Sequence, residues 1–259
     1  MPKEILNIQN LVISVTNTSR EQRIVDGLNL IITEQKIVAL VGGSGSGKTT
    51  TGLSILGLLP DALKVCQGMI LFFGENLLAS SVDRLRKIRG KEIAMVFQEP
   101  LNAFNPVFRI GEQIEEVLLF HTTLNRRARE ERVKELLHRV GIPEPLRVAR
   151  SYPHQLSGGM RQRAMLAQAI AAGPKLIIAD EPTSSLDVTL QAHIIELLKK
   201  LRDELSLSIL LITHDLGMVE HLADEVAVLF NGEVVEFGPT ESIVRRPQHE
   251  FTRQLMEAF

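Results

Sequence analysis

A short apolar run, Ile37–Val41, leads directly into the glycine-rich segment Gly42–Thr49, and this junction restricts the possible folds more than any other feature of the chain. The segment reads GGSGSGKT and fits the pattern G-x-x-x-x-G-K-[ST]. A helix-forming stretch follows, so the sequence predicts a buried strand, a tight loop and a helix in succession. A glycine-rich turn without a ligand is the alternative, but average residue usage produces this pattern by chance in only about one chain per hundred.

The chemistry of this loop suits the phosphates of a nucleotide. Glycines let the backbone curl so that successive N–H groups face the β- and γ-phosphates, and the following helix adds the positive end of its dipole. Lys48 adds a full positive charge, and the hydroxyl of Thr49 is suited to ligate Mg²⁺. The predicted nucleotide-binding residues of this segment are Gly42, Gly43, Ser44, Gly45, Ser46, Gly47, Lys48, Thr49 and Thr50.

A phosphate loop alone would also suit a kinase, a GTPase or a motor protein, and two acidic residues narrow the choice. Asp180 and Glu181 follow the apolar run Leu176–Ala179, at a strand end where carboxylates can face the loop. Asp180 is placed to hold Mg²⁺, directly or through water. Glu181 is the natural group to polarise a water for in-line attack, a role worth about 10²–10⁴-fold in rate. Helix capping is the alternative reading of the two acids.

Two further polar residues follow apolar runs in the same way. Gln98 closes the run Ile93–Phe97 and offers an uncharged oxygen to Mg²⁺ or water. His214 follows Ile209–Thr213 and is suited to hydrogen-bond the γ-phosphate and the attacking water. Alone, a histidine or glutamine at a strand end is more often structural than catalytic. Because four strand ends carry groups suited to one nucleotide site, we predict a catalytic set that includes Glu181.

The apolar runs also predict the fold class. They do not alternate with polar residues, as expected of strands that are buried on both faces. Helical patterns lie between them, and in the best of these, Val188–Leu205, apolar residues recur at i, i+4, i+7 and i+8. Strands that alternate with helices favour an α/β fold with a mainly parallel sheet.

Two regions depart from this pattern. Glu4–Val15 and Asn29–Thr33 resemble half-buried strands of an antiparallel β flap. Residues 100–173 contain little strand signal, and helices are expected at Arg109–Phe120, at Arg126–Val140 and from Gly158 onward. We therefore expect one domain, whose core comprises residues 1–99 and 174–259 and whose inserted helical subdomain comprises residues 100–173.

Composition excludes several classes of protein. Net charge is −2, so no overall basic field marks a nucleic-acid-binding protein. Cys66 is the only cysteine, which excludes an internal disulfide, and we expect its side chain to be at least partly buried. The N-terminus does not read as a signal peptide, and no apolar run approaches the roughly 18 residues of a membrane span. Any role at a membrane therefore requires a partner protein.

The segment Leu156–Met160, with the sequence LSGGM, points to a second phosphate contact. A serine followed by two glycines at a helix start exposes N–H groups and a hydroxyl that suit an anion. The predicted contacts are Ser157, Gly158 and Gly159. Since Gly42–Thr49 already provides such a cradle, this second one suggests binding to the nucleotide of another molecule.

With these motifs in order, the sequence strongly resembles the ATP-binding cassette (ABC) ATPase family over essentially its whole length. The matching segments are a Walker A loop at Gly42–Thr49, a glutamine loop at Gln98, a signature at Leu156–Met160, Walker B at Leu176–Glu181, an aspartate loop at Ser185–Asp187 and a switch histidine at His214. The resemblance implies a RecA-like P-loop NTPase core, ATP and Mg²⁺ as cofactors, and a nucleotide contact by Asp187. It also implies a head-to-tail dimer in which Ser157 and Gly159 close over the partner's ATP.

Three segments resemble one branch of this family, the importers for oligopeptides, dipeptides and nickel. They are Gln98–Pro106 (QEPLNAFNP), the signature with Met160, and the tail Pro247–Thr252, which is close to P-x-H-x-[YF]-T. The Gly42-Gly43 opening and the early C-terminus are more similar to nickel-type members, whereas oligopeptide members commonly continue through a cysteine-bearing extension. Nickel or another metal chelate and peptides therefore both remain open as cargo.

The resemblance implies an ATPase coupled to transport, a translocase that works peripherally at the cytoplasmic face of the cell's inner membrane. Its expected partners are a second ATPase subunit, identical or a sibling, two permease subunits and a solute-binding protein, but no nucleic acid. The alternative function is that of a soluble cassette protein that acts in translation or DNA repair. Such relatives usually join two cassettes in one chain or carry long coiled-coil insertions, and neither feature is visible in this sequence. Glu181 and His214 argue against a regulator without turnover.

One position departs from the family pattern. The family usually stacks adenine on an aromatic residue after the first strand, and the matching position is Val15. No aromatic residue occurs between Met1 and Phe72. Base stacking is worth about 1–3 kcal/mol in nucleic-acid complexes. We therefore expect either weaker adenine selectivity or contacts from apolar side chains such as Val15 and Ile24.

Overall fold

The computed structural model describes residues 3–16, 22–99, 103–184 and 186–257. The chain forms two compact units. The first unit comprises Met1–Arg86 and Ser206–Phe259, and the second unit comprises Lys87–Leu205. Among the helices in these described ranges, none is both long and apolar enough to span a bilayer.

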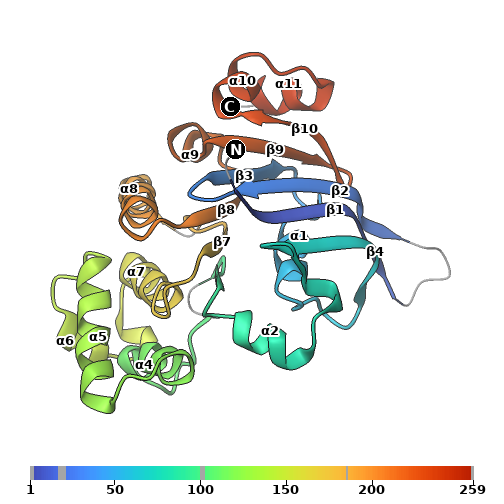
Figure 1. The fold of residues 1–259 in the computed structure, drawn as a ribbon. Coiled ribbons are helices and arrows are strands. Elements are labelled where there is room, and N and C mark those ends of the chain that lie inside the picture. Colours follow the sequence, from blue (N-terminus) through green and yellow to red (C-terminus); the bar gives the residue numbers. More distant parts are fainter. Residues whose placement is uncertain (1–2, 17–21, 100–102, 185, 258–259) are drawn as a thin grey trace. The chain divides into compact units, whose positions relative to one another are not determined.

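An antiparallel sheet in the first unit confirms the predicted flap, with strand order β2-β1-β4-β5 (Figure 1). Its strands are β1 (Glu4–Val15), β2 (Arg23–Thr33), β4 (Leu63–Phe72) and β5 (Glu75–Asn76). β2 begins at Arg23, six residues before the predicted start at Asn29. The sequence prediction missed these residues because polar side chains at the start of the strand hide its alternating pattern. β4 carries Cys66, whose side chain is exposed, so the expectation of burial was wrong. In the first half of β4, alternate side chains such as Lys64 and Cys66 are exposed to solvent.

A second group of strands in the first unit is mainly parallel. β3 (Ile37–Gly42) pairs in parallel with β8 (Ser208–Thr213) and with β9 (Glu225–Phe230), and β9 pairs antiparallel with β10 (Glu233–Pro239). Every residue of β3 and β8 is buried, which explains why both runs lack polar alternation.

Helices complete the first unit. They are α1 (Lys48–Ile55), η1 (Leu77–Ala79), α9 (Leu216–Leu222), α10 (Thr240–Arg245) and α11 (Glu250–Glu257), and α2 (Val82–Ile88) continues into the second unit. Figure 1 shows α10 and α11 beside β10. Thr240 at the start of α10 is tied to the chain before β9, because its hydroxyl donates to the Ala223 carbonyl at 2.7 Å.

The second unit combines two parallel strands with helices. The strands are β6 (Ile93–Val96) and β7 (Leu176–Asp180). The helices are α4 (Ile110–His121), α5 (Arg126–Arg139), α6 (Pro145–Arg150), η2 (Pro153–Gln155), α7 (Gly158–Ala169) and α8 (Val188–Leu205). Figure 1 shows α4, α5, α6 and α7 gathered in one cluster. The bounds 100–173 for an inserted subdomain stay a prediction, since this compact unit also includes β6, β7 and α8.

Candidate functional site

The phosphate loop joins β3 to α1 and has the backbone that its sequence requires. Gly47, the N-cap of α1, has φ 104°, a value that side-chain-bearing residues rarely adopt. A Cβ at Gly47 would lie 2.7 Å from the Ile24 carbonyl oxygen, so only glycine fits against β2. The loop is anchored to the helix by Thr51, whose hydroxyl donates to the Gly47 carbonyl at 2.9 Å.

Lys48 lies inside this loop and only 8% of its surface is exposed. Its ammonium donates to the carbonyl oxygens of Gly42 at 2.9 Å and Gly43 at 2.8 Å. The loop therefore holds this positive charge at the start of α1. A preplaced cation at the start of a helix is the arrangement that binds phosphate.

The other loop residues divide between a rim and a base. Gly43, Ser44, Gly45 and Thr49 are exposed, Thr50 is half-buried, and Ser46 is buried. The exposed N–H groups and the Thr49 hydroxyl suit a phosphate with its Mg²⁺, so the residues present fit Mg²⁺–ATP.

His214 lies at the same strand edge as the phosphate loop. Thr213 pairs with Val41 across β8 and β3, so His214, which follows Thr213, lies beside Gly42, the last residue of β3. The His214 side chain is exposed. Asp215 fixes the turn after it, because its carboxylate accepts the Met218 N–H at 3.0 Å and caps α9.

In the second unit the structure brings Gln98 and Glu181 together. Val96 of β6 pairs with Ala179 of β7. Gln98 lies two residues after Val96, and Glu181 lies two residues after Ala179. The Gln98 Nε2 donates to the Glu181 Oε2 at 2.9 Å. Asp180, the last residue of β7, is only 3% exposed. The backbone of Glu181 has φ 44°, which turns the chain sharply at the end of the strand.

The signature segment forms the start of α7. Ser157 is exposed at the N-cap, where its hydroxyl oxygen accepts the Met160 N–H at 3.3 Å. Gly158 is half-buried and Gly159 is buried. A Cβ at Gly159 would lie 3.2 Å from the Leu190 side chain of α8, so the helices pack closely at this position. Ser157 thus presents a polar helix start to solvent, as the sequence predicted.

Asp187 and Val15 have roles in the structure that the sequence did not indicate. Asp187 caps α8, since its carboxylate accepts the Leu190 N–H at 2.9 Å. Val15 is half-buried and pairs with Leu63 in the antiparallel sheet. Ile24 has its backbone carbonyl oxygen packed closely against Gly47. Pro100, Leu101, Asn102 and Ser185, which belong to the predicted glutamine and aspartate loops, lie outside the described residues.

Sequence reasoning missed Gln113, which shapes the loop before α4. This side chain is 7% exposed. It accepts the Asn105 N–H at 2.8 Å and donates to the carbonyls of Asn105 and Phe108 at 3.0 Å each. The signal was a lone amide on the apolar face of a predicted helix. Gln113 fixes a turn that leaves Val107 and Phe108 exposed at 71% and 51%.

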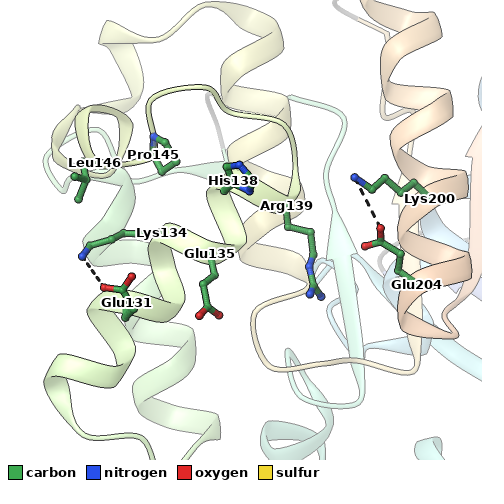
Figure 2. A pocket seen from close by; sticks show the side chains of 9 residues that line it. All are labelled: Glu131, Lys134, Glu135, His138, Arg139, Pro145, Leu146, Lys200 and Glu204. Carbon is green, nitrogen blue, oxygen red and sulfur yellow. Dashed lines mark hydrogen bonds and ion pairs between the residues drawn. The ribbon is translucent and has the colours of Figure 1, made fainter.

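A charged hollow of about 640 Å³ also lies in the second unit, between α5, α6 and α8 (Figure 2). Lys134 pairs with Glu131 at 2.7 Å, and Lys200 pairs with Glu204 at 3.8 Å. The hollow contains none of the residues that the motifs predict. With its lysines matched by nearby acids, it is a poor site for a triphosphate.

Comparison with known proteins identifies the family. The model of the family described as ABC transporter matches residues 25–184, which is more than half of the chain. The chain belongs to the ABC transporter family. This membership establishes the P-loop NTPase fold and ATP binding for the chain, and it accounts for the order of the Walker A, signature and Walker B segments.

Several relatives are similar over nearly the whole chain. One, named as a peptide import ATP-binding protein of Brucella abortus strain 2308, is 47% identical over 98% of this chain and 76% of its own length. The oligopeptide transport ATP-binding protein OppD of Bacillus subtilis is 44% identical over 97% of this chain and 71% of its own length. The dipeptide transport ATP-binding protein DppD of the same organism is 43% identical over 98% of this chain and 76% of its own length.

Solved structures give the same family. A dimeric ATP-binding cassette in a post-hydrolysis state, bound to ADP and Pi, has a TM-score of 0.81 and 30% identity, with 91% of this chain and 98% of that chain covered. The protein cbiO1 of Clostridium perfringens, part of an ABC transporter complex, has a TM-score of 0.78 and 27% identity, with 99% of both chains covered.

Proposed function

We propose that this chain is the ATP-hydrolysing subunit of a peptide importer, attached to the cytoplasmic face of the cell membrane through two permease subunits. The observation that carries the proposal is the 43–47% identity, over nearly the whole chain, to proteins named for import of peptides, oligopeptides and dipeptides. None of these three names refers to nickel. Peptides are therefore favoured over a metal chelate as cargo, and a solute-binding protein would deliver them.

In this proposal the phosphate loop binds ATP through preplaced donors. Lys48 already carries its charge among the Gly42 and Gly43 carbonyls, and it would turn to the β- and γ-phosphates. Thr49, Asp180 and the Gln98 amide oxygen would supply the oxygen ligands that Mg²⁺ prefers. Mg²⁺, when bound, neutralises charge that develops on the phosphates during transfer.

Hydrolysis would depend on Glu181 as the general base. Its carboxylate accepts a proton from the water that attacks the γ-phosphate, and His214 hydrogen-bonds that phosphate and the water. The Gln98 amide restrains the carboxylate through its 2.9 Å hydrogen bond. The products are ADP and phosphate, and release of phosphate would reopen the site.

A second ATPase subunit, identical or a sibling, completes the site in this proposal. The exposed Ser157 and the N–H groups of Gly158 and Gly159 would contact the triphosphate held by the partner subunit. A solved cassette at 30% identity is described as a dimer bound to ADP and Pi, which supports pairing. Asp187 would face the partner's nucleotide from the start of α8.

An apolar surface on the second unit fits the permease subunits. Val107, Phe108, Leu119 and Phe120 lie on α4 or just before it and are exposed at 71%, 51%, 55% and 74%. Phe108 and Leu119 line the same hollow on this unit, and exposed apolar residues that lie together mark interaction sites. Because Gln113 fixes the turn before α4, nucleotide-driven movement of this unit would reach the permeases as a rigid displacement.

The test is transport by the assembled system. The chain is reconstituted in proteoliposomes with the permeases and solute-binding protein encoded beside it, and uptake of labelled peptide and of Ni²⁺ is measured with and without ATP. ATP-dependent peptide uptake is the expected result. Uptake of Ni²⁺ alone would reject the peptide assignment, and copurification with ribosomes or DNA instead of permeases would reject transport.

A further inference from the structure

Gln162 of α7 is a buried polar residue that has no role in the ATP binding and hydrolysis proposed above. Its side chain is 1% exposed, and its Nε2 has no hydrogen-bond partner among the residues that the structure describes. Its neighbours are satisfied, because Arg161 donates to the Leu156 carbonyl at 2.8 Å and Arg163 to the Val140 carbonyl at 2.7 Å. A buried donor without an acceptor costs free energy and requires an explanation.

Helical periodicity places Gln162 on the face of α7 that carries Gly158 and Gly159. A Cβ at Gly158 would lie 3.6 Å from the Cδ2 of Leu186, and one at Gly159 would lie 3.2 Å from the Cδ1 of Leu190. This face of α7 therefore points to the segment that links β7 to α8. Glu181 begins this segment and Asp187 ends it.

The first part of this segment, Glu181–Ser184, is a tight turn. The Ser184 N–H donates to the Glu181 carbonyl at 3.2 Å, and the Thr183 carbonyl accepts the Gln191 amide at 3.3 Å. Glu181 itself has the left-handed value φ 44°. A left-handed backbone at a residue other than glycine costs free energy and persists only where the surrounding structure holds it, and such residues cluster at active sites and switch regions.

We propose that Gln162 is a positioning residue whose amide N–H binds a main-chain carbonyl of Glu181–Ser184 only when ATP is bound and the dimer is closed. The hydrogen bond couples the seating of Ser157–Gly159 on the partner's nucleotide to the placement of Glu181. Within the described part of the chain, this donor has no partner. This inference rests on the proposed function, since it requires ATP-driven closure.

The experiment compares two glutamines on the same helix. Gln162→Met removes the unpartnered donor and keeps the length of the side chain. Gln168→Met is the matched control, because the Gln168 amide has a partner already, the Gln113 carbonyl at 3.4 Å. For each variant we would measure the melting temperature without nucleotide and the rate of ATP hydrolysis. ATP-driven dimerisation is measured in variants that also carry Glu181→Gln.

Gln162→Met is expected to raise the melting temperature without nucleotide by about 2–4 °C. The same variant should lower hydrolysis and dimer affinity about tenfold, a typical strength of coupling between sites. Gln168→Met should lower the melting temperature and leave dimer affinity within about twofold.

Two results would overturn the role of Gln162 while the wild-type chain remains active. A lower melting temperature for Gln162→Met would show that the amide already has a partner without nucleotide. A higher melting temperature with unchanged hydrolysis and dimerisation would show an unpartnered donor that has no function. A wild-type chain that neither hydrolyses ATP nor dimerises with it would overturn the proposed function, and this role with it.

Discussion

The side-chain amide of Gln98 donates a hydrogen bond to the carboxylate of Glu181, with 2.9 Å between Nε2 and Oε2. The bond joins residues that follow neighbouring parallel strands, two positions beyond the paired residues Val96 and Ala179. The amide nitrogen restrains the proposed base, while the oxygen of the same amide is the proposed ligand of Mg²⁺. In the proposed function, one side chain would therefore link Mg²⁺ to the group that activates water.

Replacing Glu181 with glutamine keeps the size of the side chain and removes its ability to accept a proton. We expect Glu181→Gln to lower steady-state ATP hydrolysis by about 10²–10⁴-fold. ATP binding should persist, so the dimer should accumulate with trapped ATP. Phosphate release and size-exclusion chromatography measure both effects. Glu196→Gln, on an exposed face of α8, is the control, and normal turnover by Glu181→Gln would show that another group is the base.

Lys48 is predicted to act in binding rather than in the chemical step. Its buried ammonium donates to the loop that is proposed to hold phosphate, at 2.9 Å from the Gly42 carbonyl oxygen. Hydrogen bonds to charged groups are worth about 1.5–3 kcal/mol, so Lys48→Ala should weaken ATP binding by about 10–100-fold. Titration with a fluorescent ATP analogue measures the affinity. Lys64→Ala, an exposed lysine of β4, should bind normally, and unchanged binding by Lys48→Ala would contradict its role.

Much of the fold could be predicted from the sequence because its central strands are short, continuous apolar runs. β3 and β8 are buried at every residue, and the helix expected at Val188–Leu205 has those bounds in the structure. β4 was not predicted, because Lys64, Cys66 and Gln67 are exposed and interrupt its apolar pattern. α6 was missed because its six residues are too few to show a helical period.

The candidate site could be predicted only where residue type and spacing carry the information. The loop around Lys48 and the pair of residues after β7 have such patterns. The bond between Gln98 and Glu181 depends on strand register, which no motif states. Gln113 joins α4 to a turn eight residues earlier. The sequence shows an amide on the apolar face of a predicted helix, but it does not show which backbone groups that amide bonds.

Ser157 tests whether the signature segment acts on a partner subunit. Ser157→Arg adds a long side chain at the exposed start of α7, away from the phosphate loop in sequence. We expect ATP binding by the monomer to be unchanged and ATP-driven dimerisation to be lost, with hydrolysis falling to the level of the monomer. Light scattering with ATP, in the presence of Glu181→Gln, measures dimerisation. Full ATPase activity in Ser157→Arg would contradict a contact across the dimer.

Phe120 tests the proposed permease surface. Its side chain is 74% exposed at the end of α4, so a charge there should not disturb folding. Phe120→Asp should weaken association with the permeases at least about tenfold, because interface aromatics contribute about 2 kcal/mol or more. ATP binding should not change. Phe237→Asp, at a 45% exposed aromatic on β10, is the control, and equal permease binding by both variants would exclude this surface.

The tail motif Pro247–Thr252 has a structural explanation in Glu236 of β10. The Glu236 carboxylate accepts the N–H groups of Gln248 at 2.8 Å and His249 at 3.0 Å, at the start of α11. Partial burial raises the pKa of Glu236, but the hydrogen bonds from the N–H groups of Gln248 and His249 outweigh it, so the net pKa lies below the ordinary value. Phe251 then stacks on Phe230, with ring centroids 4.1 Å apart.

Because the folded pKa of Glu236 is depressed, its contribution to stability is complete above the unfolded value of about 4.3 and is lost as pH falls through the folded value. Glu236→Gln should therefore lower the melting temperature most near neutral pH. The difference from wild type should shrink as the pH is lowered below about 4. Thermal denaturation across this range measures it, with Glu233→Gln, an exposed acid on the same strand, as the control. A difference that stays constant into acid would show that the charge of Glu236 does not hold the tail.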